Sequence, residues 1–351
     1  MNCYCTSQPA GNIKNLLGGV KNSRCKSPRR YLCYDSRAFL PVSAALRSFL
    51  LRRFLLVLPV LLGVCTLVFA LIHLIPGDPV QVMLGEGATA ADLADLRARL
   101  GLNQPLLDQY AHFLRHLFMG DLGTSFRYRE PVRELIFDRY PATILLAGSS
   151  MLLACLIAFP AGVLAAVHRG KSGDRIATTL SLLGLSLPSF WVGPILILIF
   201  SVRLDWFPVS GMEEPRAIVL PSIALGTALA AILTRMIRAS LAEEISSPYC
   251  VAAAARGLGN WEVVLRHSLK NAFVPVVTVL GLQAGVLLTG AVITETVFGW
   301  PGLGRLTIQA IETRDYPLVQ GCILMIALTY LLVNLMTDLA YAVLDPRIRY
   351  G

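Results

Sequence analysis

Charged residues are scarce in this chain of 351 residues. Asp, Glu, Lys and Arg together make up 15% of it and hydrophobic residues 55%, whereas an ordinary globular protein is roughly 25% charged. A soluble protein of this composition could not cover its surface with polar groups, and a disordered chain would leave too much apolar area in water. The long uncharged stretches therefore predict an all-α integral membrane protein.

The sequence also lacks the motifs of several large enzyme classes. It contains no His-Glu-x-x-His and no Gly-x-Ser-x-Gly segment. Gly170-Lys171-Ser172 resembles the end of a phosphate-binding loop, but Ala165 stands where its first glycine belongs. We therefore predict no catalytic residue, no cofactor and no metal site. The net charge of +9 is ascribed to membrane topology rather than to nucleic-acid binding.

Six segments are long and apolar enough to cross a bilayer, which takes about 20 residues. Six crossings place both termini on one side of the membrane. If that side is cytoplasmic, it holds roughly two thirds of the 31 Lys and Arg residues, as the positive-inside rule requires. The sequence therefore predicts cytoplasmic N and C termini. The predicted spans are Phe54–Ile75, Ala142–Val167, Ile176–Val202, Ile218–Ile237, Phe273–Val297 and Leu318–Leu344.

The remaining residues fall into a tail and two long loops. Residues 1–45 are basic and too poor in apolar side chains to form a core, so we expect either a disordered leader or a mis-assigned start. Residues 46–351 form the membrane domain. Its outside loop, 77–141, carries amphipathic stretches that either cover the membrane helices or offer a docking surface to a soluble partner.

The cytoplasmic loop 239–271 has an unusual run of small residues. Residues 249–256 predict a short helix with an alanine face that includes Ala252 and Ala253. Gly257 is expected to end this helix, because glycine adopts the left-handed conformation easily. Asn260 can cap a second helix. The pattern predicts a helix–turn–helix elbow whose small residues allow another protein to approach closely.

Polar and small side chains also lie inside two predicted spans, where they are costly and therefore informative. In the third span Ser186 and Ser189 flank a proline that is expected to kink the helix. In the fifth span Gln283 and Thr289 accompany two glycines spaced four residues apart. Residues of this kind serve both close helix packing and the lining of a pathway, so both interpretations stay open.

Several segments resemble the permeases of bacterial binding-protein-dependent ABC importers. The resemblance is to the dipeptide, oligopeptide and nickel branch of that family, and it extends from about Leu46 to the C-terminus. The cytoplasmic elbow resembles the EAA loop of these permeases. The other matching segments are Phe54–Pro79, Gly120–Phe126, Leu187–Trp191, Glu295–Arg305 and Leu344–Arg347.

The resemblance implies the type I importer permease architecture for residues 46–351. It also implies that Val251, Ala252, Ala253 and Gly257 belong to the coupling helix that docks into an ATP-binding subunit. Val251 stands where the motif has an acidic residue, which members of this branch often lack. The implied partners are two ATP-binding subunits, a second homologous permease and an extracytoplasmic solute-binding protein, in the lipid of the bacterial inner membrane.

The expected function is one transmembrane half of an ATP-driven importer. The chain itself is not expected to be an enzyme, because ATP would be hydrolysed on the partner subunits. Peptides are the leading substrate class, and nickel or a nickel chelate is the second. A stand-alone channel or secondary carrier is an alternative of another class. It would be expected to carry an ionisable coupling residue at mid-span, which these spans lack.

Overall fold

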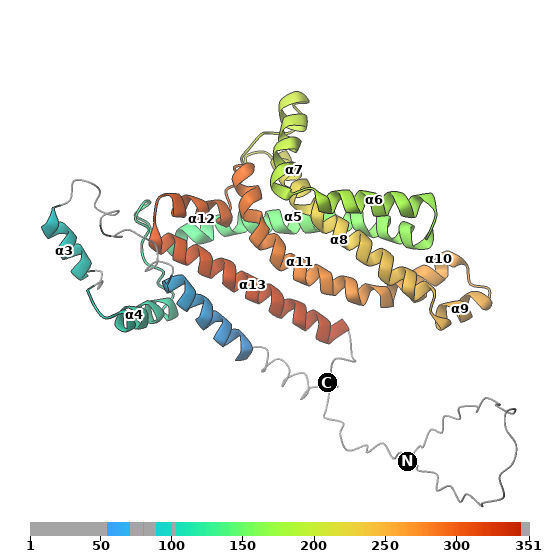
Figure 1. The fold of residues 1–351 in the computed structure, drawn as a ribbon, viewed down its shortest axis with the longest axis horizontal. Helices are drawn as coiled ribbons and strands as arrows, with labels where there is room; N and C mark the ends of the chain where they lie inside the picture. Colours follow the sequence, from blue (N-terminus) through green and yellow to red (C-terminus); the bar gives the residue numbers. More distant parts are fainter. Residues whose placement is uncertain (1–54, 71–79, 81–88, 100–102, 345–351) are drawn as a thin grey trace, which may run out of the picture. The chain divides into compact units, whose positions relative to one another are not determined.

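The computed structural model describes residues 55–70, 80, 89–99 and 103–344. Within these ranges every regular element is a helix, and the only β-type pairing there is an isolated bridge between Thr124 and Pro131. The all-α prediction is confirmed for this part of the chain (Figure 1). The predicted tail 1–45 and the ending 345–351 lie outside the described residues.

Four of the described helices are long and apolar enough to cross a membrane, and one bent helix pair brings the number to five. The apolar helix Leu55–Ala70 lies within the first predicted span, whose other residues fall outside the described ranges. The second, fourth, fifth and sixth predicted spans correspond to α5 (Val132–Val167), α8 (Val219–Ile245), α11 (Leu269–Val297) and α13 (Tyr316–Leu344).

The third predicted span differs from the single kinked helix expected over Ile176–Val202. It consists of α6 (Ser172–Ser186) and α7 (Ser189–Leu196), and α7 continues into the π-helix η2 (Ile197–Arg203). The two parts are bent by 103°. Leu187, with φ −87° and ψ 119°, is extended, because the ring of Pro188 disfavours a helical conformation in the residue before it. The proline therefore breaks the span.

Helices extend into both segments that were predicted as long loops. α5 begins at Val132, directly after the extended Pro131, and contains Pro141 and Pro160 in its interior. The last part of the predicted outside loop is therefore helical. On the other side, α8 runs to Ile245, and the π-helix η4 (Val263–Ser268) leads directly into α11. Most of the predicted loop 239–271 is thus helical.

The amphipathic stretches of the outside loop form α3 (Ala90–Arg99) and α4 (Leu106–Phe118). α4 packs on the helix Leu55–Ala70. The rings of Phe69 and Tyr110 meet edge to face with centroids 5.2 Å apart, and the Tyr110 hydroxyl lies 2.7 Å from Thr66 Oγ1. α4 therefore covers part of the membrane domain, which is one of the two roles predicted for this loop.

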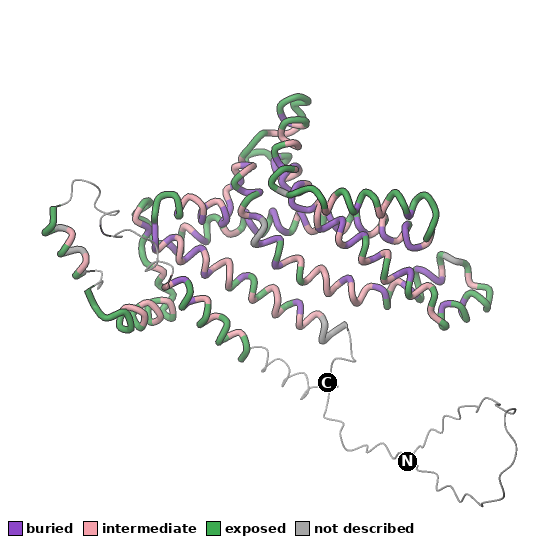
Figure 2. The backbone as a smooth tube through the Cα atoms, in the orientation of Figure 1, coloured by how far each residue is buried: buried purple, intermediate pink, exposed green. Residues whose placement is uncertain are grey.

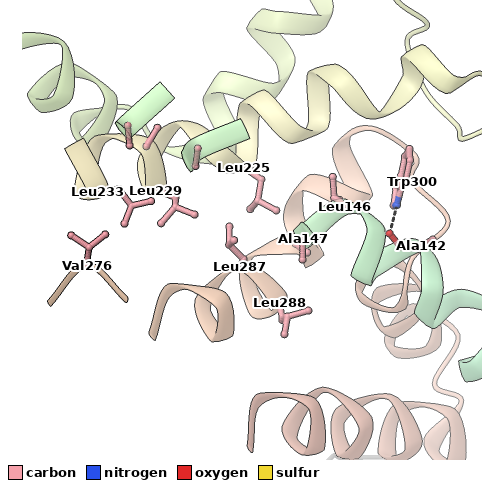
Figure 3. Packing of buried hydrophobic residues seen from close by; sticks show 14 of the residues in the cluster. Ala142, Leu146, Ala147, Leu225, Leu229, Leu233, Val276, Leu287, Leu288 and Trp300 are labelled. Carbon is pink, nitrogen blue, oxygen red and sulfur yellow. Dashed lines mark hydrogen bonds between the residues drawn. The ribbon is translucent and has the colours of Figure 1, made fainter. Parts of the chain in front are cut away.

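α8 is the central helix of the bundle. In its most apolar window 67% of the residues are buried, against 33% in that of α5, and exposed positions dominate the peripheral helices α4 and α6 (Figure 2). α5 packs closely along α8, because a Cβ at Gly162 would lie 2.8 Å from the side chain of Ile237. Figure 3 shows the apolar layer between α8 and α11, formed by Leu225, Leu229, Leu233, Val276 and Leu287.

The glycine pair of the fifth span is a packing motif. A Cβ on Gly285 would lie 2.6 Å from the ring of Tyr330, and one on Gly281 would overlap the side chain of Thr337. Both neighbours belong to α13. Small residues spaced four apart allow two membrane helices to approach closely. At these two glycines α11 therefore packs closely against α13.

Candidate functional site

The predicted helix–turn–helix elbow is present at the end of α8. It comprises residues 248–268, with α9 (Pro248–Ala255), a turn, the short α10 (Asn260–Glu262) and η4. The elbow lies at one end of the long helices, and α12 (Leu303–Glu312) lies at the opposite end (Figure 1). α11 connects the two ends, and its 29 residues span about 43 Å at 1.5 Å per residue.

Gly257 ends α9 in the left-handed conformation, with φ +91°. Its amide donates to the carbonyl of Ala254 at 3.0 Å, and the next amide, that of Leu258, donates to Ala253 at 3.4 Å. No atom lies within 4 Å of a Cβ built at Gly257. The position therefore requires glycine for its backbone conformation and not for lack of space, which confirms the conformation predicted for this turn.

The four predicted coupling residues do not share one face of the elbow. Val251 is 59% exposed, and Ala252 and Gly257 are also exposed. Ala253 is only 8% exposed, because it packs with Cys250, Val263 and the half-buried Leu258 inside the elbow. Ala253 therefore does not lie on the exposed alanine face on which the sequence analysis placed it. Added bulk at this position would first disrupt the elbow itself.

Tyr249 joins the two helices that flank the elbow, a role that the sequence analysis missed. Its hydroxyl donates to the carboxylate of Glu244, near the end of α8, and accepts a hydrogen bond from Asn271 Nδ2 at the start of α11, at 2.9 Å. Burial and the neighbouring Glu244 carboxylate raise the pKa of Tyr249 above its usual value. The hydroxyl therefore keeps its proton, and with it the donated bond to Glu244.

A second polar contact fixes α8 near the elbow. Arg238 donates two hydrogen bonds to Asp174 at the start of α6, the one from Nη2 measuring 2.9 Å. The Asp174 side chain is only 6% exposed and also accepts from the amide of Gly170 at 2.8 Å. A bidentate arginine–carboxylate pair is geometrically specific. It therefore holds the α5–α6 turn against α8.

The predicted pathway or packing residues lie on three helices. Ser186 is exposed on α6, and its hydroxyl donates to the carbonyl of Leu182 at 2.9 Å. Gln283 is half-buried on α11. Ser189 begins α7 and Thr289 lies on α11, but their side chains are outside the described part of the structure. α6, α7 and α11 each pack against α8.

A buried carboxylate, also missed from the sequence, organises the α12 end. Glu295, fully buried near the end of α11, accepts from Thr143 Oγ1 at 2.7 Å and from the amide of Arg305 at 3.0 Å. Thr143 Oγ1 in turn accepts from the amide of Leu303 at 2.8 Å. Trp300, in the turn between α11 and α12, donates from Nε1 to the carbonyl of Ala142 on α5 at 2.9 Å (Figure 3). Together these bonds tie α5, α11 and α12 into one unit.

From the sequence, Glu295 was recognised only as the first residue of a motif. Its complete burial near the end of α11 was not predicted. No group of three or more His, Cys, Asp or Glu side chains is placed to hold a metal ion among the described residues.

Comparison with known proteins places the whole arrangement in one family. Residues 158–350 match the family described as "binding-protein-dependent transport system inner membrane component", and residues 46–147 match its N-terminal membrane component. The glutathione transport system permease protein GsiC of Salmonella typhimurium is 43% identical over 303 residues, covering 86% of this chain and 99% of the relative. The dipeptide transport system permease protein DppB of Escherichia coli is 42% identical over 335 residues, with the same coverage.

A solved structure shares the fold. A chain of the MetNI methionine ABC transporter, in an inward-facing conformation, matches with a TM-score of 0.52 at 20% identity, and the match covers 60% of this chain and 96% of that chain. The likeness supports the architecture alone. The two family matches show the family, and so do the relatives, which align over nearly their whole length. The chain therefore belongs to the binding-protein-dependent transport system inner membrane components, the membrane permease subunits of ABC importers.

Proposed function

We propose that the chain is one transmembrane half of an ATP-driven importer that moves di- or oligopeptides across the bacterial inner membrane. The names of the relatives support the substrate class, since GsiC is a glutathione and DppB a dipeptide permease. The observation that carries the proposal is the elbow. It presents the exposed, small-residue side of α9 at one end of the helices, on a turn that Gly257 fixes.

The proposed topology has six spans with both termini in the cytoplasm. Residues 46–351 then form the permease domain, the elbow faces the cytoplasm, and α4 and α12 lie outside. The Lys/Arg bias of the loops supports this orientation. Residues 1–45 form a basic tail that takes no part in the permease domain.

In the proposed mechanism α9 docks into an ATP-binding subunit with its exposed residues Val251 and Ala252. Movement of that subunit would reach the membrane domain through α8 and α11, because Tyr249 bonds to both of them. Near its other end α11 carries Glu295, which is hydrogen-bonded to α5 and α12. A displacement at the elbow is thereby linked to the opposite end by one continuous helix. A packed element of this kind can carry coupling between distant sites.

The complete transporter would contain two ATP-binding subunits, a second homologous permease and a solute-binding protein that delivers substrate on the α12 side. The exposed apolar side chains of α6 and α7, such as Leu180, Phe190 and Trp191, are available to lipid or to the second permease. The chain supplies a gated path, while ATP is hydrolysed on its partners.

Uptake in reconstituted vesicles tests the proposal. The chain is assembled with its ATP-binding subunits, the second permease and the solute-binding protein, and the uptake of radiolabelled dipeptide, glutathione and nickel is measured with and without ATP. We expect ATP-dependent uptake of a peptide. If only nickel were taken up with ATP, the substrate class would be nickel and not peptides. Uptake without any ATP-binding subunit would contradict the proposal that the chain belongs to an ATP-driven importer.

A further inference from the structure

A small polar cavity lies at the α12 end of the bundle, where α12 packs beside the first turns of α5 (Figure 1). Its volume is about 180 Å³, and its polar lining comes from Tyr128, Arg139, Arg305 and Gln309. Arg139 lies on α5, and the other two helical residues lie on α12. The cavity is thus built by three separate segments of the chain.

The lining carries two positive charges and no acidic residue. The guanidinium of Arg139 has no hydrogen bond or ion pair to another residue in the described part of the chain. The guanidinium of Arg305 donates from Nη1 to the carbonyl of Gly299 at 2.5 Å, which leaves its other nitrogens available. Two such groups in one concave site attract an anion, and each can bind a planar oxyanion through two parallel hydrogen bonds.

The buried network below the cavity holds Arg305 in place. The Arg305 amide is bonded to Glu295, and the Leu303 amide is bonded to Thr143, so the first turn of α12 is fixed. These amides are already occupied, and the attraction for an anion therefore comes from the arginine side chains. Tyr128 and Gln309 also line the cavity, and both side chains contain neutral hydrogen-bond donors. Arg305 is therefore positioned before an anion binds, which lowers the entropy lost at this residue, whereas the Arg139 side chain, which has no such bond among the described residues, must be ordered on binding.

From these residues we infer that the cavity binds the carboxylate of the peptide that the transporter carries, on the side where substrate arrives. This inference rests on the proposed function and deepens it. A cavity of 180 Å³ has room for a terminal carboxylate and a few neighbouring atoms. A docking protein would instead be met by a broad flat surface. The site would favour peptides with a free C-terminal carboxylate over those in which it is blocked.

The first measurement is direct binding to the purified complex of both permeases and the ATP-binding subunits, without the solute-binding protein. Calorimetric titration compares L-alanyl-L-alanine with L-alanyl-L-alaninamide, which lacks the carboxylate. We expect the free dipeptide to bind at least about tenfold more tightly, because a charge-assisted bidentate contact is lost in the amide. The variants Arg139→Gln and Arg305→Gln should each abolish this difference. The control Arg133→Gln, exposed on the same helix but outside the cavity lining, should preserve it.

The second measurement separates a small carboxylate from an acidic side chain of the solute-binding protein. Co-sedimentation of that protein with the complex should be the same for the wild type and for Arg139→Gln. Reduced co-sedimentation together with unchanged dipeptide binding would assign the arginines to protein docking and overturn the inference. Equal binding of dipeptide and dipeptide amide by the wild type would also overturn it. If the wild type bound the carboxylate but took up no peptide, the site would stand and the proposed transport function would fail.

Discussion

Thr143 on α5 and Glu295 on α11 share a hydrogen bond of 2.7 Å, and both side chains are buried. Both side chains also accept hydrogen bonds from amides at the start of α12. Thr143 accepts from the amide of Leu303, and Glu295 accepts from the amide of Arg305. A carboxylate at the beginning of a helix satisfies free amides and interacts favourably with the helix dipole. Glu295 therefore caps a helix other than its own and fixes the α12 end of the bundle.

Replacing Glu295 with Ala should destabilise the protein by about 2–4 kcal/mol, because the amide of Arg305 and the O–H donor of Thr143 would both lose their acceptor. Glu295→Gln should cost less, since one acceptor oxygen is kept. The measurement is thermal or denaturant unfolding in detergent. The matched control is Glu312→Ala, at the exposed C-terminal end of α12, which should stay within about 0.5 kcal/mol of the wild type. Equal effects of Glu295→Ala and Glu312→Ala would contradict the capping role.

Gly281→Ala should destabilise the packing of α11 on α13 by about 1–3 kcal/mol, because the added methyl overlaps Thr337 in a close helix contact. Gly148→Ala on α5 is the control, since a Cβ there meets nothing within 4 Å. This control should be neutral or slightly stabilising, as alanine is the better helix former. The two variants are compared by unfolding in the same detergent, and a loss that is as large at Gly148 as at Gly281 would argue against the packing motif.

Much of this fold could be predicted from the long apolar segments of the sequence and from its turn residues. Four of the six predicted spans coincide with single long helices, because long apolar segments must form helices to satisfy their backbone in lipid. The elbow was predicted because Gly257 breaks a run of alanines. Pro188 was recognised as a source of distortion, but the size of the bend, 103°, depends on how α6 and α7 each pack against the rest of the bundle. A single sequence does not contain that information.

The missed residues depend on contacts between distant segments. Tyr249 and Glu295 carry no local pattern that reveals their partners, since Asn271, Thr143 and Arg305 meet them only in the folded chain. The burial of Ala253 was missed for a related reason. A helix rich in alanine has no clear apolar stripe, so the side that packs on Val263 cannot be distinguished in advance from the exposed side.

Reporter fusions test the proposed orientation. Fusions at Gly123 and Gly302 should report an extracytoplasmic location, and fusions at Ser172, Gly259 and Gly351 should report the cytoplasm, as the Lys/Arg bias of the loops requires. Two reporters are fused at each position. Alkaline phosphatase is active only outside the cytoplasm, and green fluorescent protein fluoresces only inside it. An extracytoplasmic result at Gly259 would contradict both the topology and the cytoplasmic assignment of the elbow.

Gly257→Val should destabilise the end of α9 by about 1–2 kcal/mol or more, because a side chain is strained at φ +91°. Gly259→Val offers a matched control two residues away, where φ is not in the left-handed region and no atom lies within 4 Å of the added Cβ. Hydrogen exchange measured on the assembled transporter should show faster exchange of the α9 amides in the first variant only. Identical exchange in both variants would contradict the conclusion that position 257 requires glycine.

The central proposal is that the exposed side of α9 docks into an ATP-binding subunit. The variant Ala252→Trp tests this docking most directly. This variant adds bulk at an exposed position of the elbow, whereas Ala111→Trp adds the same bulk at an exposed position of α4. The measurement is the amount of ATP-binding subunit that co-purifies with the permease pair in detergent. We expect Ala252→Trp to lower this amount about tenfold, since a bulky group in a close-packed interface costs about 1–3 kcal/mol, while Ala111→Trp should leave it unchanged. Normal co-purification of Ala252→Trp, at normal membrane levels of the protein, would contradict the assignment of α9 as the coupling helix.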